Sequence, residues 1–555
     1  MASFAEILLK RTGPGTLKGF YEHCQKPMET QQNLLQDIIR NNMDTAYGKK
    51  HNFNQISSIS DFQKKVPVQT YEDLQPYIDA TLNGESNQLT AQAPVLYATT
   101  SGTTGIPKYI PVNKDSKSSK SQLMRVWLSK IVQDHPSVFS GRIFTMVSPE
   151  VEGYSPAGIP WGSESGHGYR SMPKMMQALY SAPYEVFEIK DYDAKYYTML
   201  RIGAGQDVTI LYTVNPSTVL LLAQRLGEYS EPIIRDIHDG TLSKQYDVSA
   251  EIRAIIEKGL KPDPKQAKRL EKAAAQYGKL LPKNVWPNMQ MIGCWKGGSV
   301  GMYLKKFPQY FPEDIAIRDI GYFSSENRGS VPLSDRGASG VLAVPTNLYE
   351  FSHVDDAGDD KKMLTIDQLE EEGEYYIYVT TQAGLYRYEM NDIIKVHAFF
   401  ENTPIIRFIQ KGKGMVSFTG EKLAEAQVIK SVEQALEQIS GEYEFIAAVG
   451  EVIDTTPQYK FLIEFEKPPT KEDARQFAKE IDYKLGIINI EYSAKRVSGR
   501  ILPCELAAIP NGEFNNYRKR MVDKGRLDGQ FKILRLTKDA SFGGEFKIDF
   551  TVSAE

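Results

Sequence analysis

Apolar residues recur three or four positions apart in several segments of the chain, a spacing that places them on one face of a helix. The clearest example runs from Leu34 to Ile39, where two apolar pairs enclose two polar residues. Such patterns predict helices over residues 29–45, 115–133, 216–228, 248–258, 424–436 and 471–485. A run rich in Ala, Lys and Glu over residues 263–279 predicts a solvated helix, with a partner-binding helix as the alternative.

Short apolar runs lie between many of these helices and end at glycine, proline or polar residues, which is typical of buried strands. They predict strands over residues 95–97, 109–112, 208–212, 315–320, 340–344, 375–380 and 405–409. An alternation of strands and helices favours sheets that are covered by helices. We therefore expect an α/β fold for most of the chain.

Two lysines and two glycines, Lys411 to Gly414, separate the last of these strands from the next helix. Beyond them the pattern is α+β, with strands expected over residues 445–450, 459–465, 487–497 and 531–536. Because glycine adopts backbone conformations that other residues avoid, this segment is suited to a hinge. The sequence thus predicts a large N-terminal domain, residues 1–412, and a small mobile C-terminal domain, residues 413–555.

The composition is that of an ordinary globular protein, with 41% hydrophobic and 25% charged residues among 555. With a net charge of −4, the chain lacks the excess of basic residues that is typical of nucleic-acid-binding proteins. The most apolar stretch, residues 208–222, is too short to span a bilayer, and three scattered cysteines argue against a disulfide framework. These features predict a cytoplasmic protein with no nucleic-acid partner and no membrane insertion, and they leave its oligomeric state open.

The segment Tyr97–Lys108 gathers hydroxyl residues and glycines into one loop that ends in a lysine. Its candidate binding residues are Thr100, Ser101, Gly102, Thr103, Thr104 and Lys108. Glycine lets backbone N–H groups approach a phosphate, hydroxyls donate hydrogen bonds and the lysine adds positive charge. The order of these residues does not fit a Walker A loop. The segment predicts a loop that binds a polyphosphate, with a polar turn between two strands as the alternative.

A second polar segment follows an apolar strand and offers Tyr322, Ser324, Ser325 and Glu326. The tyrosine can stack on a base, a serine can bind a phosphate oxygen, and the glutamate can hold Mg²⁺. These residue types suit a nucleotide site. The alternative is a plain transition from a strand to a turn.

Two further candidates lie nearer the C-terminus. Asp392 comes just before Ile393 and Ile394, an apolar pair that predicts the start of a strand. A carboxylate there can accept hydrogen bonds from the hydroxyls of a ribose, and a turn-forming Asn-Asp is the alternative. Lys532 lies beyond the predicted hinge, from where a lysine can reach a site between the domains, although most lysines are solvated surface residues.

The order and spacing of these four pieces resemble the adenylate-forming superfamily, which includes acyl-CoA synthetases, amino-acid-activating peptide-synthetase domains and luciferase. Within it, the chain is most similar to the Gretchen Hagen, or auxin-responsive promoter, family of acyl-acid amido synthetases. The similarity covers nearly the whole chain and includes Val66–Leu74, Val285–Asn288 and Thr381–Tyr388. It implies the fold of adenylate-forming enzymes, with a large domain of helix-covered sheets that binds the acyl group and ATP and a small mobile α+β domain.

The resemblance also implies roles for single residues. Those that match the family's nucleotide-binding motifs are Thr100, Ser101, Gly102, Thr103, Thr104, Lys108, Tyr322, Ser324, Ser325 and Asp392. Lys422 is a weaker candidate for nucleotide contact. Glu326 matches the catalytic residue that holds Mg²⁺, and Lys532 matches the mobile catalytic lysine.

The chain departs from the plant members of that family at four places. In the phosphate loop, Gly105 follows Thr104, where the plant members have glutamate. Asn391 stands where their ribose motif has glycine, and asparagine tolerates the left-handed conformation that a glycine would take. Residues 530–535 lack the proline of the family's C-terminal motif. Residues 150–210 do not resemble the plant hormone-binding segments, so the resemblance does not extend to a plant-hormone substrate.

The implied reaction has two steps and uses ATP and Mg²⁺ as cofactors. The carboxylate of a small acid attacks the α-phosphorus of ATP, which gives an acyl-adenylate and pyrophosphate. An amine, usually that of an amino acid, then attacks the activated carbonyl and releases AMP. Transfer to coenzyme A, which forms a thioester, is one alternative, and a nucleotide-binding homologue that has lost turnover is another. The sequence does not identify the acid or the acceptor.

Overall fold

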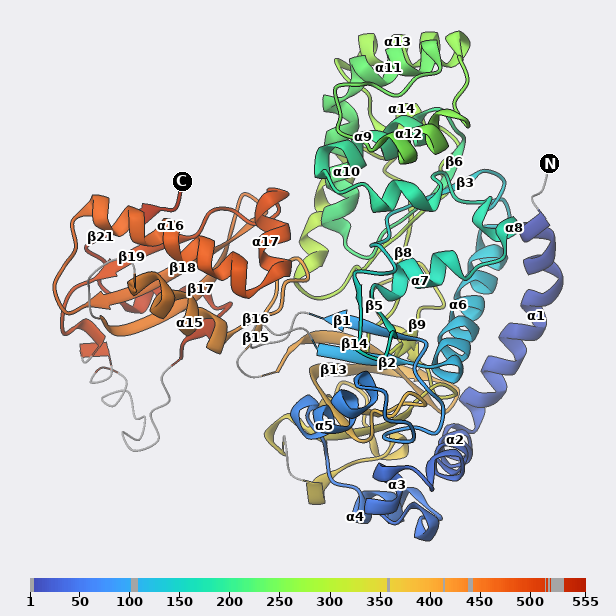
Figure 1. Cartoon of the computed structure of the whole chain (residues 1–555), viewed down its shortest axis with the longest axis vertical. Helices are drawn as coiled ribbons and strands as arrows, with labels where there is room; N and C mark the ends of the chain where they lie inside the picture. The colour runs from blue at the N-terminus through green and yellow to red at the C-terminus, as the bar shows by residue number, and fades with distance from the viewer. Residues whose placement is uncertain are drawn as a thin grey trace. The chain divides into compact units, whose positions relative to one another are not determined.

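The computed structural model describes residues 4–100, 108–356, 360–412, 415–437, 443–514, 516–517, 520 and 534–555. The chain divides into two units (Figure 1), of which the larger is formed by Met1–Thr99 and Tyr109–Gln410 and the smaller contains Lys411–Glu555. Both combine helices with β-sheets, so the expected α/β fold class is confirmed. The functional division into an acyl- and ATP-binding domain and a mobile domain stays a prediction.

A six-stranded sheet with the order β11-β12-β13-β14-β10-β9 forms one half of the larger unit. Its strands are β9 (Ser330–Val331), β10 (Gly340–Leu342), β11 (Leu348–His353), β12 (Glu374–Thr380), β13 (Tyr388–Phe400) and β14 (Thr403–Lys411). Helices cover it, namely α2 (Pro27–Asn42), α3 (Ala46–Lys50), α4 (Ile59–Lys65) and α5 (Tyr71–Leu82). Ile38 of α2 and Ile78 of α5 belong to the same buried cluster as Ile377 of β12, which confirms the helix predicted over residues 29–45.

A parallel sheet with the order β3-β6-β7-β8 forms the other half. Its strands are β3 (Arg142–Thr145), β6 (Val208–Tyr212), β7 (Met291–Gly293) and β8 (Ala316–Arg318). Alternate residues face two different cores: Ile210 packs in one cluster and Leu211 in the other. Because both faces are buried, these strands are mostly apolar, as is typical of parallel sheets. The sequence predicted β6 and β8, whereas β3 and β7 were not predicted.

Helices lie on both faces of the parallel sheet. One face is covered by α1 (Phe4–Gln25) and α6 (Lys114–Asp134), which run side by side in Figure 1. The other is covered by α9 (Tyr192–Ala204), α10 (Pro216–Glu228), α11 (Ser230–Asp239), α12 (Ala250–Glu257), α13 (Pro264–Tyr277) and α14 (Pro282–Val285). None of the described helices combines the length and the apolar composition needed to cross a bilayer.

A third, small sheet has the order β2-β1-β5-β4. It consists of β1 (Leu96–Thr100), β2 (Lys108–Val112), β4 (Gly153–Tyr154) and β5 (Pro160–Gly162), and it is followed by α7 (Glu164–Arg170) and α8 (Lys174–Gln177). Short 3₁₀ helices at Phe53–Gln55, Tyr184–Glu188, Gly298–Gln309, Val354–Asp356, Asp360–Lys362 and Ile366–Gln368 complete the larger unit. Asn113 caps α6 by accepting a hydrogen bond from the Ser116 N–H, so that helix starts directly after β2.

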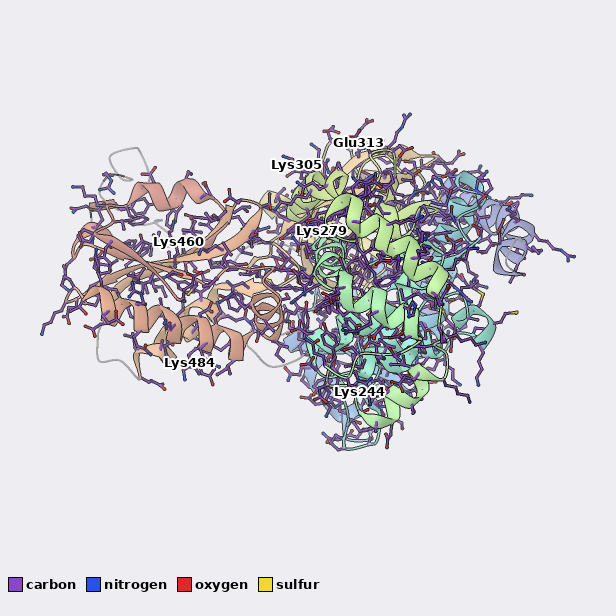
Figure 2. All side chains as sticks on the ribbon, turned by 90° about the horizontal axis from the view of Figure 1, so that it is seen from above. Lys244, Lys279, Lys305, Glu313, Lys460 and Lys484 are labelled. Carbon is purple, nitrogen blue, oxygen red and sulfur yellow. The ribbon has the colours of Figure 1, made fainter. Side chains whose placement is uncertain are left out.

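The smaller unit is built on a mixed sheet with the order β20-β17-β18-β19-β21. Its elements are β15 (Met415–Val416), β16 (Leu423–Ala424), α15 (Glu425–Leu436), β17 (Tyr443–Ile453), β18 (Thr456–Phe465), α16 (Lys471–Ile488), α17 (Ile490–Val497), β19 (Glu505–Ile509), β20 (Leu536–Thr537) and β21 (Phe550–Ser553). Figure 2 shows Lys460 on this sheet, where its ammonium lies 2.7 Å from Glu451 and 3.4 Å from Glu505. The ion pairs therefore link three neighbouring segments of the sheet.

The strand predicted over residues 487–497 is wrong, because α16 continues to Ile488 and α17 occupies Ile490–Val497. Alternating apolar residues suggested a strand, but Asn489 caps α17 by accepting a hydrogen bond from the Tyr492 N–H. Tyr492 is buried, whereas Ile490 is 68% exposed, so the apolar alternation has no matching burial. Helix capping by Asn489 therefore decides the local structure against the strand that the alternating apolar residues suggest.

Two other expectations need correction or restriction. Asp392 does not precede a strand: it is the fifth residue of β13, four positions after Tyr388, because that strand begins before the apolar pair. The preceding Asn391 has the left-handed φ of 51° that its replacement of glycine anticipated. Of the strand predicted over residues 531–536, residues 531–533 lie outside the described part of the chain, and β20 begins at Leu536.

A buried ion pair holds the end of β11 against the start of β13. Both carboxylate oxygens of Glu350 lie 3.0 Å from Nε of Arg387, and both side chains are almost fully buried. The same guanidinium donates to the carbonyls of Gln63 and Val66 at 3.0 and 2.6 Å. The pair thus ties the segment before α5 to the strand that carries Asp392.

We predict that Glu350→Ala destabilises the larger unit by about 3–5 kcal/mol, because it removes the buried counter-charge of Arg387 and leaves only the more exposed Asp360, at 3.5 Å. The measurement is the shift of the urea unfolding transition. Glu257→Ala is the matched control, since the Arg253–Glu257 pair of α12 is a surface pair at 3.3 Å, and it should cost well under 1 kcal/mol. Equal shifts for the two variants would contradict the importance given to the buried pair.

Candidate functional site

The residues Tyr322 to Ser330 fold back on themselves directly after β8. The N–H groups of Gly329 and Ser330 both donate to the carbonyl of Tyr322, at 2.7 and 3.2 Å, and the Tyr322 N–H donates to Oγ of Ser330. Gly321 begins this hairpin with a φ of 89°, and a Cβ there would lie 2.2 Å from the Ser330 carbonyl oxygen. Only glycine fits at that position, and the hairpin presents residues 324–326 at its tip.

The side chain of Tyr322 joins this hairpin to the strand that carries Asp392. Its hydroxyl donates a hydrogen bond of 2.6 Å to Oδ2 of Asp392, and both residues are buried. Burial, and next the charge on Asp392, raise the pKa of Tyr322 well above its usual value, so the phenol remains a donor. The structure therefore brings together two predicted site residues that are 70 positions apart in the sequence.

Glu326 lies close to the same pair. The pKa of Tyr388 is raised well above normal by burial and next by the charge on Glu326, and the charge on Glu326 also raises the pKa of Tyr322. Glu326 lines a cavity of about 10 Å³ together with Ser325, Thr346 and Thr381, which is room for roughly one water-sized group. The charges of two carboxylates, Glu326 and Asp392, thus affect the same pair of buried tyrosines, Tyr322 and Tyr388.

This set of oxygen donors fits a Mg²⁺ ion that is completed by other ligands. Carboxylate and hydroxyl oxygens are the ligands that Mg²⁺ accepts, and it usually takes one or two carboxylates together with waters and substrate phosphates. Among the residues that the structure describes, no group of three or more His, Cys, Asp or Glu is arranged as a metal cage. The site therefore suits an ion that arrives with a phosphate rather than a permanently held metal.

A lysine from α6 reaches the tip of the hairpin. Nζ of Lys120 donates to the carbonyl of Ser325 and to Oε2 of Glu164, both at 2.8 Å. The Ser324 N–H donates to the carbonyl of Asn327 at 2.7 Å, while the buried Ser324 hydroxyl has no hydrogen-bond partner within the described part of the chain. A hydroxyl held in this way is available to a ligand.

A groove of about 470 Å³ is lined by Lys296, Gly297, Arg407 and Phe408, and Phe408 connects it to Tyr322. The rings of Tyr322 and Phe408 are nearly parallel, with centroids 6.1 Å apart and an angle of 6° between their planes. The volume is that of a small-molecule site, and aromatic faces of this kind suit a planar ring system.

Asp319 connects the groove to the hairpin. Its two carboxylate oxygens accept hydrogen bonds from the N–H groups of Lys296 and Gly321, each at 2.7 Å. Burial raises the pKa of Asp319 to about 6, against the effect of these hydrogen bonds. One side chain therefore fixes the backbone on both sides of Tyr322.

The remaining predicted residues are placed only in part. Thr100 ends β1 and Lys108, which is half-buried, begins the neighbouring β2, so both ends of the predicted phosphate loop lie in adjacent strands. Lys422 belongs to the smaller unit, where its carbonyl accepts a hydrogen bond from Asn489 at 3.0 Å. The predicted residues outside the described part of the chain are Ser101, Gly102, Thr103, Thr104 and Lys532.

Sequence reasoning missed Lys120, Phe408 and the groove that Phe408 lines. Phe408 lies in an ordinary strand pattern, and no local signal tells that its ring faces Tyr322. Lys120 follows a run of serines and lysines at the start of α6, a pattern that is typical of a solvated helix end. The place of both residues in the candidate site is evident only from their contacts with segments far away in the sequence.

Comparison with known proteins shows the family of the chain. Residues 16–316 match the model of the GH3 family N-terminal domain, residues 340–411 that of the GH3 family central domain and residues 425–541 that of the GH3 family C-terminal domain. The chain is 25% identical to the probable indole-3-acetic acid-amido synthetase GH3.1 of Arabidopsis thaliana over 93% of its length and 90% of the relative's. It is also 25% identical to the jasmonoyl–L-amino acid synthetase JAR4 of Nicotiana attenuata, over 91% and 90% of the two chains.

A solved structure shares the fold. The GH3.15 acyl acid amido synthetase superposes with a TM-score of 0.66 at 20% identity, over 97% of each chain. At this level of identity the likeness concerns the fold, and the chemistry has to be argued from the residues.

We predict that Asp392→Ala weakens ATP binding by roughly ten- to a hundredfold, because hydrogen bonds to a charged group are worth about 1.5–3 kcal/mol. Isothermal titration calorimetry provides the measurement. Tyr322→Phe, which removes the hydroxyl and keeps the carboxylate, should have a smaller effect. Asp314→Ala, at an exposed position, is the control, and an affinity unchanged in Asp392→Ala would remove this residue from the site.

Proposed function

Because this chain belongs to the GH3 (Gretchen Hagen) family, we propose that it is an ATP-dependent ligase that joins a carboxylic acid to an amine. The acid is first adenylated, with release of pyrophosphate, and the acyl group is then transferred to the amine, with release of AMP. The observation that carries the proposal is the match of three consecutive family domains along the chain. The amido synthetases to which it is similar act, by their names, on different acids.

The nucleotide occupies the region around Tyr322 in this proposal. Asp392 accepts hydrogen bonds from the ribose hydroxyls, and Tyr322 holds that carboxylate in place through its 2.6 Å hydrogen bond. The base lies in the groove beside Phe408, whose size and aromatic wall are suitable. Ser324 and Ser325, at the tip of the hairpin, contact phosphate oxygens.

Glu326 holds Mg²⁺, with the hydroxyls of Thr346 and Thr381 nearby in the same cavity. When bound, the ion neutralises charge on the phosphates, which otherwise repel an attacking carboxylate. Lys120 fixes the backbone of Ser325 and so orients Glu326. The buried tyrosines around Glu326 and Asp392 exclude water from the reacting groups.

Three parts of the proposal rest on sequence. Thr100, the residues 101–104 and Lys108 form the phosphate loop, and Lys532 enters the site to act in adenylation. Residues 413–555 form a domain that swings about a hinge near residues 411–414, so that Lys532 can approach and withdraw, and Lys422 contacts the nucleotide. A cytoplasmic location is proposed because all three cysteines are free and buried.

The amine acceptor is preferred over coenzyme A because the relatives are named as amido synthetases. The test is ATP–pyrophosphate exchange over a panel of carboxylic acids, followed by mass spectrometry of the products formed with amino acids or with coenzyme A. We expect exchange with a subset of acids and an amide as the product. A thioester would move the assignment to an acyl-CoA synthetase, and the absence of exchange with every acid would indicate a nucleotide-binding homologue without turnover.

We predict that Glu326→Gln abolishes Mg²⁺-dependent pyrophosphate exchange, because the amide no longer provides a charged ligand for the ion. The change is nearly isosteric, so the circular dichroism spectrum should stay that of the wild type. Glu313→Gln, at an exposed position, is the matched control. Exchange at the wild-type rate in Glu326→Gln would rule out the metal role.

We predict that Lys532→Ala slows acyl-adenylate formation by about 10²-fold or more, because the variant loses a cation that acts as the α-phosphorus becomes crowded. Acyl transfer started from synthetic acyl-adenylate should be much less affected, since that phosphorus is no longer attacked. The two half-reaction rates are measured in the same variant. Collapse of transfer with intact adenylation would assign the lysine to the other step.

A further inference from the structure

A histidine near the candidate site is held between a carboxylate and an ammonium group. Nδ1 of His167, on α7, lies 2.7 Å from Oε1 of Glu150, and its Nε2 lies 3.1 Å from Nζ of Lys117, on α6. The other oxygen of Glu150 lies 3.2 Å from Nε of Arg170. The side chains of His167 and Glu150 are only 16% and 17% exposed.

These two partners fix the state of the imidazole. An ionised carboxylate can only accept a hydrogen bond and an ammonium group can only donate one. The proton of His167 is therefore on Nδ1, and Nε2 presents a lone pair. This is the neutral, base form of histidine, oriented by a carboxylate in the way that bases in acyl-transfer enzymes are oriented.

The position of His167 connects it to the candidate site. One turn earlier on α7, Glu164 binds Lys120, and Lys120 donates to the carbonyl of Ser325, next to Glu326. Lys117 and Lys120 are one turn apart at the start of α6, which follows β2 and the predicted phosphate loop. His167 thus contacts Lys117, which lies one helical turn from Lys120, the residue in contact with the hairpin tip.

Nε2 of His167 already accepts from an ammonium group, that of Lys117. An amine substrate also arrives as an ammonium ion at neutral pH, and it cannot attack a carbonyl until it has lost a proton. The flexible four-carbon stem of Lys117 permits its withdrawal when another ammonium group takes its place. Nε2 therefore already accepts a hydrogen bond from an ammonium group, which is the interaction that an amine substrate needs in the second half-reaction.

We propose that His167, oriented by Glu150, is the general base that removes the proton from the attacking amine; this rests on the proposed function. Nε2 takes one proton from the ammonium group, and the freed lone pair of the nitrogen forms the C–N bond to the acyl carbon. The bond from that carbon to the AMP oxygen breaks, AMP leaves with the electron pair, and the nitrogen loses its second proton to water. Imidazolium then returns its proton to solvent.

Several charged or polar groups surround this histidine. They are Glu150 and Lys117 in direct contact, Arg170 and Glu164 on α7, Lys120 on α6, and the phenol of Tyr184, which accepts from the Glu150 N–H at 2.6 Å.

The experiment measures both half-reactions of His167→Gln in the full chain, with the acid and amine found for the wild type. Glutamine can hydrogen-bond but cannot take up a proton, so transfer at pH 7 should fall by about 100-fold, with partial recovery at higher pH as more amine is free. Pyrophosphate exchange should stay within about twofold. His238→Gln is the matched control, since His238 also pairs with a carboxylate, that of Asp239 at 2.7 Å, but on the exposed surface of α11.

Two further variants separate a base from a structural contact. Glu150→Gln should slow transfer more than exchange, because the imidazole loses the carboxylate that orients it, and Lys117→Met should keep transfer at or above the wild-type rate. An equal fall of exchange and transfer in His167→Gln, or loss of transfer in Lys117→Met, would overturn the proposal. If the wild type forms amide and His167→Gln transfers at the same rate, only this proposal fails; if the wild type forms no amide, the proposed function fails as well.

Discussion

The hydrogen bond between Tyr322 and Asp392 is the contact on which the candidate site depends. It joins the hairpin after the parallel sheet to the middle of the six-stranded sheet, and it is buried at both ends. A buried carboxylate is costly unless it is hydrogen-bonded or paired, so this geometry is stable only when both sheets are formed. The site is thus a product of the fold of the whole larger unit and not of one motif.

Two kinds of polar anchoring surround that contact and serve different purposes. The Arg387–Glu350 pair and the Asp319 carboxylate bind protein groups, so they fix backbone positions. The hairpin tip, by contrast, leaves the Ser324 hydroxyl without a hydrogen-bond partner within the described residues. Buried polar groups that the protein leaves unsatisfied are those available to a substrate.

Much of this could be predicted from the sequence because local patterns reflect local physics. Two strands of the parallel sheet, β6 and β8, could be predicted from their apolar runs, whereas β3 and β7 were missed. The residues of the hairpin tip follow β8 as a short polar motif. The strand predicted over residues 487–497 is wrong, because the alternating apolar pattern suggests a strand whereas Asn489 caps a helix there. The contacts of Phe408, Lys120 and His167 depend on the register of elements far apart in the sequence, which no local pattern contains.

The central claim is that a nucleotide binds across Tyr322, with its ribose at Asp392 and its base in the groove beside Phe408. A crystal structure of the full chain with ATP and Mg²⁺ tests it most directly. The account predicts that both ribose hydroxyls lie within hydrogen-bond distance of the Asp392 carboxylate and that the base lies against Phe408. A nucleotide bound elsewhere, with Asp392 making no contact to the ribose, would contradict it.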